Sequence, residues 1–259
     1  MTPRIYIDRP LAAGDALDLP TAQTRHVQVL RLQPGDPLTL FNGAGGEWQA
    51  RVTQMARSGV GVRIEAHANV DRELARHVTL ALGMPANERM DALVEKATEL
   101  GVAVIQPLVC ERSVLRLAGE RAVKRLAHWR GITVAASEQC GRTQVPEVRA
   151  VLGLPEWVAA ATRSDEEPGS ATEGARKTRR FVLSPNAATQ WRSAAAGPAG
   201  TALVLLSGPE GGLSAAEREL AVGSGFMAVS LGARVLRADT APLAVLAWCG
   251  FESGLVVNG

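Results

Sequence analysis

Two short segments near the C-terminal end of the chain share one plan, in which an apolar strand leads through a loop into a helix. In the first, residues 202–206 form an unbroken apolar run, which is typical of a strand buried on both faces of a parallel sheet. The loop at residues 208–212, Gly-Pro-Glu-Gly-Gly, follows this run. Ser214 and Glu217 then form a capping-box pattern, which predicts that a helix begins at about Ala215.

The second segment repeats this plan. Residues 227–231 are predicted to form the strand and residues 232–237 the loop, and Asp239 or Thr240 is predicted to cap the helix. Pro242 fits only the first turn of a helix, which supports that start. Two glycine-containing loops at the carboxyl ends of strands in one sheet predict a pocket for a small molecule.

A strand, a glycine loop and a helix are also how any α/β protein turns a corner, so one such loop alone is not evidence of a site. The pair differs because Glu210 and Arg237 place charges inside glycine-rich or apolar turns. Neither of the common nucleotide-binding patterns, G-x-x-x-x-G-K-[ST] or G-x-G-x-x-G between a strand and a helix, is present. The glycine-rich residues 43–46 are followed by an alternating run, which indicates a hairpin turn.

The two segments, GPEGGLS at residues 208–214 and LGARVLRADTA at 231–241, resemble the C-terminal signature of the SPOUT class of RNA methyltransferases. Within that class, the chain resembles the ribosomal RNA small subunit methyltransferase E family over most of its length. Further similar segments are PRIYID (3–8), HVQVLRL (26–32), EKATELGV (95–102), ERSV (111–114) and EQCGRTQVPEV (138–148). The chain departs from the family at Asp239, where glutamate is usual, and at Pro242, where a small non-proline residue is usual.

The resemblance implies an α/β fold, a SPOUT-type parallel sheet with a C-terminal trefoil knot, preceded by a small PUA-like β-barrel. It implies an enzyme that methylates N3 of one uridine in 16S ribosomal RNA of the small subunit, with S-adenosylmethionine as the methyl donor. Two other functions stay open: ribose 2′-O methylation by a related SPOUT enzyme, and a non-catalytic RNA-binding factor in ribosome assembly. Binding of S-adenosylmethionine would separate the last of these from an enzyme.

By resemblance, three loops hold the methyl donor: the two described above and a third at residues 183–187. Leu206, Leu231 and Leu236 are predicted to sandwich the adenine ring. The predicted cofactor-binding residues are Leu183, Pro185, Leu206, Ser207, Gly208, Pro209, Glu210, Gly211, Gly212, Leu231, Gly232, Val235, Leu236, Arg237, Thr240 and Ala241.

The chemistry requires that the proton on uridine N3 leave or be shared, because only then is the nitrogen a good nucleophile. A base or a positive charge beside the uracil oxygens would assist, since negative charge develops there. Arg142 and Glu210 are the predicted catalytic residues, with Arg142 orienting the base or stabilising its anion. The alternative for Arg142 is a surface helix pair with Glu138 at i,i+4, worth a few tenths of a kcal/mol.

Residues 1–70 are predicted to form a separate domain, because short runs of alternating apolar and polar residues are separated there by turn signals. The exception is a helix predicted at 21–32, with Thr21 as its cap. The resemblance makes this a PUA-like RNA-binding β-barrel, and residues 71–73 look like the linker. Residues predicted to contact RNA are Arg4, Arg9, Arg25, Arg31 and Arg112. Arg4, Arg9, Arg25 and Arg31 could each equally be an ordinary solvated arginine.

Residues 74–259 alternate between strand and helix patterns, which indicates a parallel sheet. Helices are predicted from near Asn87, at 120–138 and at 240–251. Strands are predicted at 78–83, 102–109, 181–183, 202–206 and 227–231. Residues 161–180 are rich in Ser, Gly, Pro and charge and are predicted to be a mobile insertion.

The helix predicted at 240–251 is apolar on almost every side, so it needs more than one covering surface. Together with the resemblance, this predicts a homodimer formed through the C-terminal domain.

Composition narrows the remaining possibilities. A net charge of +2 is too small to indicate nucleic-acid binding by itself, so RNA contact requires local clustering. Three widely spaced cysteines and four histidines without ligand spacing predict neither a disulfide framework nor a metal site. With no long apolar run and no signal-peptide core, we expect no membrane association and a cytoplasmic location.

Overall fold

The computed structural model describes residues 2–57, 59–166, 178–195 and 200–252, and the chain divides into two compact units. The first unit comprises Met1–Glu73 and Val134–Val145, and the second comprises Leu74–Thr133 and Pro146–Gly259. The sequence predicted a domain boundary at residues 70–74, and the longer of the two segments of the first unit ends there, at Glu73. Residues 134–145, which the sequence placed in the second domain, belong to the first unit.

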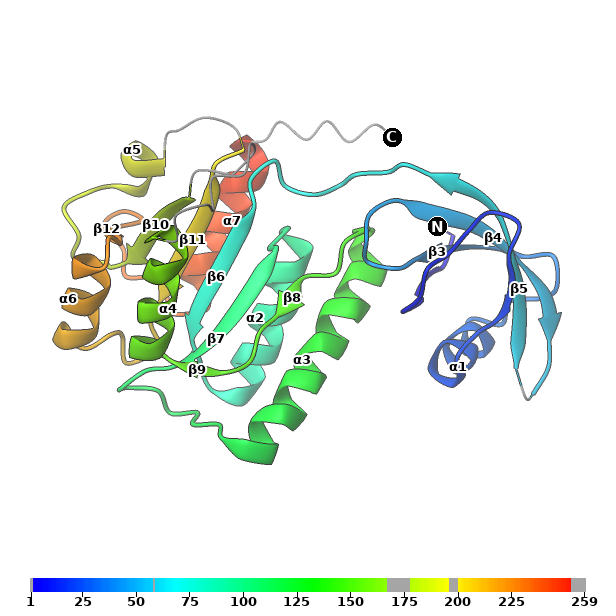
Figure 1. The fold of residues 1–259 in the computed structure, drawn as a ribbon, viewed down its shortest axis with the longest axis horizontal. Helices are drawn as coiled ribbons and strands as arrows, with labels where there is room; N and C mark the ends of the chain where they lie inside the picture. Colours follow the sequence, from blue (N-terminus) through cyan, green and yellow to red (C-terminus); the bar gives the residue numbers. More distant parts are fainter. Residues whose placement is uncertain (1, 58, 167–177, 196–199, 253–259) are drawn as a thin grey trace. The chain divides into compact units, whose positions relative to one another are not determined.

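The first unit is built around one sheet (Figure 1). Its elements are β1 (Arg4–Tyr6), β2 (Ala16–Asp18), α1 (Thr21–Val29), β3 (Pro37–Phe41), β4 (Glu47–Met55) and β5 (Val60–Ala68). The strand order is β1-β3-β4-β5-β2, with β1 and β3 parallel and the other pairs antiparallel. The barrel expected from the sequence is therefore observed as a five-stranded sheet with β1 and β2 at its edges. Alternate residues of β4, namely Trp48, Ala50 and Val52, face the core.

Helix α1 is shorter than predicted and is not capped by Thr21. The N-cap residue is Pro20, without a side-chain hydrogen bond, and Thr21 is the first helical residue. Arg31 has a φ of +58°, in the left-handed region, so the chain leaves the helix there rather than continuing to Leu32.

The second unit contains a sheet in which every strand pair is parallel. Its strands are β6 (Val78–Gly83), β7 (Val104–Val109), β8 (Glu147–Val148), β9 (Leu152–Gly153), β10 (Thr178–Leu183), β11 (Ala202–Ser207) and β12 (Met227–Val229). The order is β12-β10-β11-β6-β7-β8, and β9 also pairs with β7. The helices are α2 (Asn87–Glu99), α3 (Gly119–Cys140), α4 (Leu154–Glu166), α5 (Trp191–Ala195), α6 (Ala215–Gly223) and α7 (Thr240–Glu252). The last turns of α3 belong to the first unit.

Helices cover both faces of this sheet. Along β6, Leu80 and Leu82 join a core cluster with residues of α2, α5 and α7, whereas Ala81 joins a second cluster with residues of α4 and α6. The predicted burial of residues 202–206 on both faces is confirmed, because Leu205 belongs to the first cluster and Leu206 to the second. The architecture is a layered α/β/α sandwich.

Several boundaries differ from those predicted. The N-cap of α2 is Ala86 rather than Asn87, and β12 ends at Val229 rather than at 231. Of the predicted insertion, residues 161–166 continue helix α4 and residues 178–180 begin β10. Residues 167–177 lie outside the described part of the chain. The apolar residues at the start of α4, including Trp157, pack into the core and support this helix.

Candidate functional site

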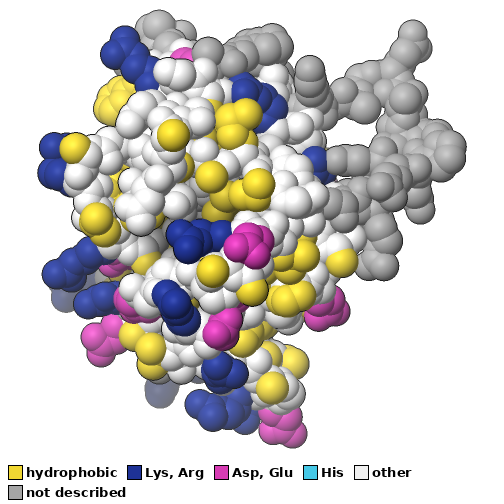
Figure 2. Space-filling model, turned by 90° about the vertical axis from the view of Figure 1, so that its left-hand side faces the viewer, with side chains coloured by type: hydrophobic (Ala, Val, Ile, Leu, Met, Phe, Trp, Pro, Cys, Tyr) yellow, Lys and Arg dark blue, Asp and Glu magenta, His cyan; other side chains and the backbone are white. Residues whose placement is uncertain are grey.

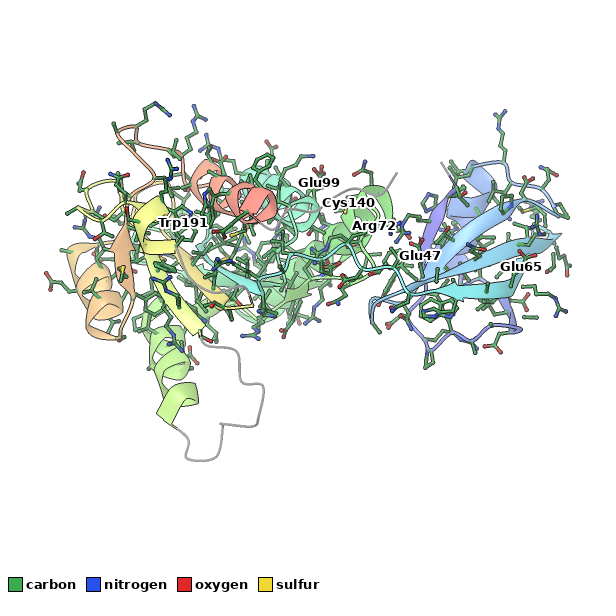
Figure 3. The ribbon with its side chains drawn as sticks, turned by 90° about the horizontal axis from the view of Figure 1, so that it is seen from above. Glu47, Glu65, Arg72, Glu99, Cys140 and Trp191 are labelled. Atoms are coloured by element: carbon green, nitrogen blue, oxygen red, sulfur yellow. The ribbon has the colours of Figure 1, made fainter. Side chains whose placement is uncertain are left out.

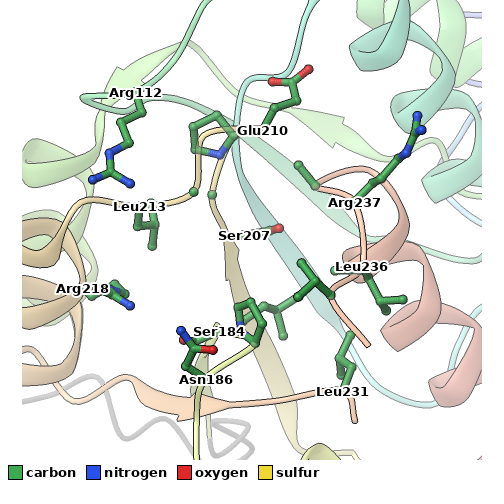
Figure 4. Close-up of a pocket in the computed structure, with 18 of the residues that line it drawn as sticks. Arg112, Ser184, Asn186, Ser207, Glu210, Leu213, Arg218, Leu231, Leu236 and Arg237 are labelled. Carbon is green, nitrogen blue, oxygen red and sulfur yellow. The ribbon is translucent and has the colours of Figure 1, made fainter. Parts of the chain in front are cut away.

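A pocket of about 520 Å³ lies at the carboxyl ends of β10, β11 and β12 (Figure 4). It is formed by the loops that follow these neighbouring strands, at the edge where α/β proteins place their ligands. Its lining residues are Arg89, Arg112, Leu183, Ser184, Pro185, Asn186, Ser207, Gly208, Pro209, Glu210, Gly212, Leu213, Arg218, Val229, Leu231, Arg234, Val235, Leu236, Arg237, Ala238 and Ala241.

The glycine loop after β11 is packed too tightly for side chains at some positions. A Cβ on Gly208 would lie 2.8 Å from the amide N of Leu213, and a Cβ on Gly83 would lie 2.5 Å from Cδ of Pro209. Such contacts are shorter than real Cβ atoms make, so these glycines are required by close backbone approach.

The start of α6 holds this loop in place. Ser214 is the N-cap, and the predicted capping box with Glu217 is confirmed, because each side chain accepts a hydrogen bond from the backbone amide of the other residue. Glu217 is buried, and its Oε1 also accepts a hydrogen bond of 2.8 Å from the amide N of Glu111. One carboxylate therefore connects the start of α6 to the loop that follows β7.

The other two loops of the pocket are joined to each other. The amide N of Ser184 donates to the carbonyl O of Val229 (2.9 Å), and that of Trp191 donates to the carbonyl O of Ser230 (2.9 Å). Leu183 and Leu231, at the starts of these loops, and Leu236 give the pocket an apolar wall. An apolar wall with a few polar groups suits a flat heterocycle such as adenine.

Charged side chains on the pocket wall are mostly basic. Five arginines line it, and Glu210 is the one acidic residue among the lining residues. Glu210 Oε1 accepts from the amide N of Ala86 at 3.0 Å and lies 3.6 Å from Nη1 of Arg89. Glu210 thereby fixes the glycine loop to the start of α2 while lining the pocket.

Most of the predicted cofactor-binding residues are brought together here. Four are not among the lining residues: Leu206 is fully buried in the core, Thr240 lines a separate groove, and Gly211 and Gly232 lie in the loops. Lining residues that the sequence did not indicate are Arg89, Ser184, Asn186, Leu213, Arg218, Val229, Arg234 and Ala238. Arg112, predicted to contact RNA, lines the pocket.

Arg142 lies elsewhere, in the first unit. It is 4% exposed and ion-paired with Glu73, and its Nε lies 3.0 Å from Oε2 of Glu73. The alternative of a surface helix pair with Glu138 is wrong, because α3 ends at Cys140 and Arg142 is buried. Glu138 Oε1 accepts from the amide N of Tyr6 (2.8 Å). Burial raises the pKa of Glu138, although the Tyr6 amide acts in the opposite direction.

The predicted RNA-contacting arginines of the first unit fall into two groups. Arg9, Arg25 and Arg31 are exposed. The Arg4 side chain is 9% exposed and is ion-paired with Glu47. Figure 3 labels Glu47 and its second partner Arg72, which lies 3.1 Å away. Arg4 is thus engaged inside the unit.

Within the described ranges, no three His, Cys, Asp or Glu side chains are placed to hold a metal ion. None of the helices described here has the length and apolar character needed to cross a membrane.

Comparison with known proteins places both units among RNA methyltransferases. A family model described as an RNA methyltransferase domain matches residues 72–250, and one described as an RNA methyltransferase PUA domain matches residues 19–65. Ribosomal RNA small subunit methyltransferase E from Synechocystis sp. is 35% identical over 237 residues, which cover 88% of this chain and 71% of that protein. The Bacillus subtilis protein of that name is 28% identical, covering 89% of this chain and 87% of its own length.

Two solved structures are similar over almost their whole length. Ribosomal RNA small subunit methyltransferase E from Neisseria gonorrhoeae, bound to S-adenosyl methionine, has a TM-score of 0.85 and 34% identity, covering 97% of this chain and 98% of its own. A putative methyltransferase from Legionella pneumophila, in complex with the same cofactor, has a TM-score of 0.84 and 35% identity, also covering 97% of this chain and 98% of its own.

Proposed function

The chain belongs to the ribosomal RNA small subunit methyltransferase E family, and on that premise we propose that it methylates N3 of one uridine in 16S ribosomal RNA. It is an S-adenosylmethionine-dependent methyltransferase of ribosomal RNA. The observation that carries the proposal is the pocket at the ends of β10, β11 and β12. Three loops form it in a fold similar to cofactor-bound structures at TM-scores of 0.85 and 0.84.

The residues of the pocket fit both the apolar and the polar part of S-adenosylmethionine. Leu183, Leu231 and Leu236 provide apolar surface for the adenine ring, and the glycine loop offers backbone groups for the polar part. When bound, the cofactor supplies an electrophilic methyl group. The protein has to orient the uracil in line with that methyl group and accommodate the N3 proton.

Glu210 is the lining residue that can share this proton. Oε1 is engaged by the Ala86 amide, and among the described residues no hydrogen bond reaches Oε2. Arg237, in the opposite loop, lines the same pocket and can stabilise negative charge on the uracil oxygens. For Arg142 the ion pair with Glu73 supports a structural role, so we propose Glu210 and Arg237 for the chemistry.

We also propose the finer features implied by family membership: the trefoil knot, with α7 passing through an upstream loop, a homodimer, a substrate within the small subunit, and a cytoplasmic location. For the dimer, support comes from a groove of about 390 Å³ between α2 and α7. Its lining is mostly apolar and includes Leu93, Leu243, Ala244 and Ala247. Light scattering of the purified chain tests the dimer, and a monomer at micromolar concentration would contradict it.

Methyl transfer to ribosomal RNA from a strain lacking the enzyme tests the reaction. We expect one methyl group on one uridine, and nucleoside mass spectrometry after hydrolysis to place it on the base. A methyl group on the ribose would identify 2′-O chemistry instead. Cofactor binding without any transfer to free RNA or to small subunits would favour a non-catalytic assembly factor.

A further inference from the structure

The cofactor does not account for the charge that lines its pocket. The lining arginines are Arg89, Arg112, Arg218, Arg234 and Arg237, with Glu210 as the single acidic lining residue. S-adenosylmethionine carries a positive sulfonium, a positive ammonium and one carboxylate at neutral pH, so its own net charge is positive. At most one arginine is needed for that carboxylate, and the remainder repel the cofactor. A pocket with such a surplus attracts a further, anionic ligand.

The backbone next to two of these arginines is held by one buried carboxylate. Glu217 Oε1 accepts from the amide N of Glu111 (2.8 Å), and its Oε2 accepts from that of Ser214 (2.9 Å). Arg112 directly follows Glu111 in the sequence, and Arg218 directly follows Glu217. The backbone at both arginines is therefore held by the same Glu217 carboxylate. In Figure 4, Leu213 is drawn between the two arginine side chains.

Both guanidinium groups are available to a ligand. Arg112 and Arg218 are exposed. Nη1 of Arg112 donates to the carbonyl O of Gly211 at 3.1 Å, which leaves its other donors for a ligand. Arg218 has neither an ion pair nor a side-chain hydrogen bond within the part of the chain that the structure describes. Figure 2, viewed from the α6 side of Figure 1, shows Lys and Arg side chains between apolar patches on that side of the molecule.

We propose that Arg112 and Arg218 form a clamp for a phosphate of the RNA backbone next to the nucleotide that is methylated. This inference rests on the proposed function, because a nucleotide whose base enters the pocket brings a phosphodiester to the pocket mouth on each side. Guanidinium groups bind phosphate through paired, charge-assisted hydrogen bonds. Because Glu217 holds the backbone on both sides of the clamp before RNA arrives, binding has to order only the two arginine side chains.

The test measures RNA binding directly, by fluorescence anisotropy of a labelled 16S ribosomal RNA fragment at several salt concentrations. For Arg112→Ala and for Arg218→Ala, we expect the slope of log Kd against log salt to fall by about 0.7 to 0.9 per removed contact. Affinity for S-adenosylmethionine, measured by calorimetry, should not fall, because these arginines repel the positively charged cofactor, and retained binding also shows that the fold survives. Arg218→Lys should keep the salt slope, since it keeps the charge, while binding RNA more weakly.

Arg192→Ala is the matched control, because Arg192 is exposed on α5 and is not among the lining residues. An unchanged salt slope in both pocket variants would overturn the clamp. Loss of cofactor affinity with normal RNA binding would overturn it too and would assign the arginines to the cofactor carboxylate. If the wild-type chain transfers no methyl group although both pocket variants lower the salt slope, the proposed function is refuted and the two arginines remain a phosphate clamp for bound RNA.

Discussion

Replacing Glu217 with glutamine removes one acceptor from a site where two backbone amides depend on the same carboxylate. The Glu217 side chain accepts hydrogen bonds from the amides of Glu111 and Ser214, and the residue is 7% exposed. Glutamine has one acceptor oxygen, so one buried amide would face the NH₂ group of the new side chain. A lost charge-assisted hydrogen bond costs roughly 1.5 to 3 kcal/mol, and the unsatisfied amide adds to it. We expect Glu217→Gln to lower the free energy of unfolding by about 2 to 4 kcal/mol.

Thermal and urea unfolding, followed by circular dichroism, measure this change. For a chain of this size, that loss lowers Tm by roughly 5 to 15 °C. Glu219→Gln makes the same chemical change two residues later on the exposed face of α6, and we expect it to stay within about 0.5 kcal/mol of wild type. Equal behaviour of the two variants would refute the idea that Glu217 connects α6 to the loop after β7.

Three further predictions concern the glycine loop, the cysteines and the first unit. Gly208→Ala should weaken S-adenosylmethionine binding in calorimetry by about tenfold or more, because its Cβ would lie 2.8 Å from a backbone nitrogen and the loop would have to move; unchanged affinity would contradict this. Burial raises the pKa of Cys110 to about 12 and that of Cys249 to about 11, so at pH 8 iodoacetamide should modify the half-buried Cys140 first in mass spectrometry; equal rates at all three thiols would contradict it. Burial opposes ionisation of Glu47, but hydrogen bonds from two arginines outweigh the effect of burial and lower the pKa of this carboxyl group. The ionised Glu47 therefore stabilises the fold above pH 4.5, its ordinary pKa, and this stabilisation is lost as the pH falls. Glu47→Gln should therefore cost roughly 1 to 3 kcal/mol at pH 7, with a deficit that shrinks below pH 4.5 in acid-unfolding curves.

The sequence predicted those parts of the fold whose cause is local. The capping box at Ser214 and the apolar run at 202–206 are found in the structure, because hydrogen-bond geometry and burial act within a few residues there. The two-residue strands β8 and β9 carry too short a pattern to be recognised. The partner of Arg142 could not be predicted either, because Glu73 lies 69 residues away and no local pattern connects them.

The same limit applies to the pocket. Two of its loops were predicted because each has a glycine-containing motif of its own, and the third, at residues 183–187, was predicted by resemblance. Arg89 and Arg218, by contrast, are single residues on the helices α2 and α6. Helix arginines usually face solvent, and only the tertiary structure reveals that these side chains line one cavity. The small net charge of +2 hides this local surplus, since charges elsewhere in the chain balance it.

The composition of the first unit from two separate segments has a consequence for synthesis on the ribosome. Although this unit contains the N-terminus, it cannot be completed until residue 145 has emerged, long after residue 73. At about 5 to 20 residues per second, the intervening stretch takes roughly 4 to 14 s to make. During that interval the glycine loop Gly43–Gly46 lacks Val145, whose Cγ2 lies 3.4 Å from the position of a Cβ on Gly43, and Glu73 lacks its ion-pair partner Arg142. The unit that contains the N-terminus therefore completes its folding only after the middle of the chain has been synthesised.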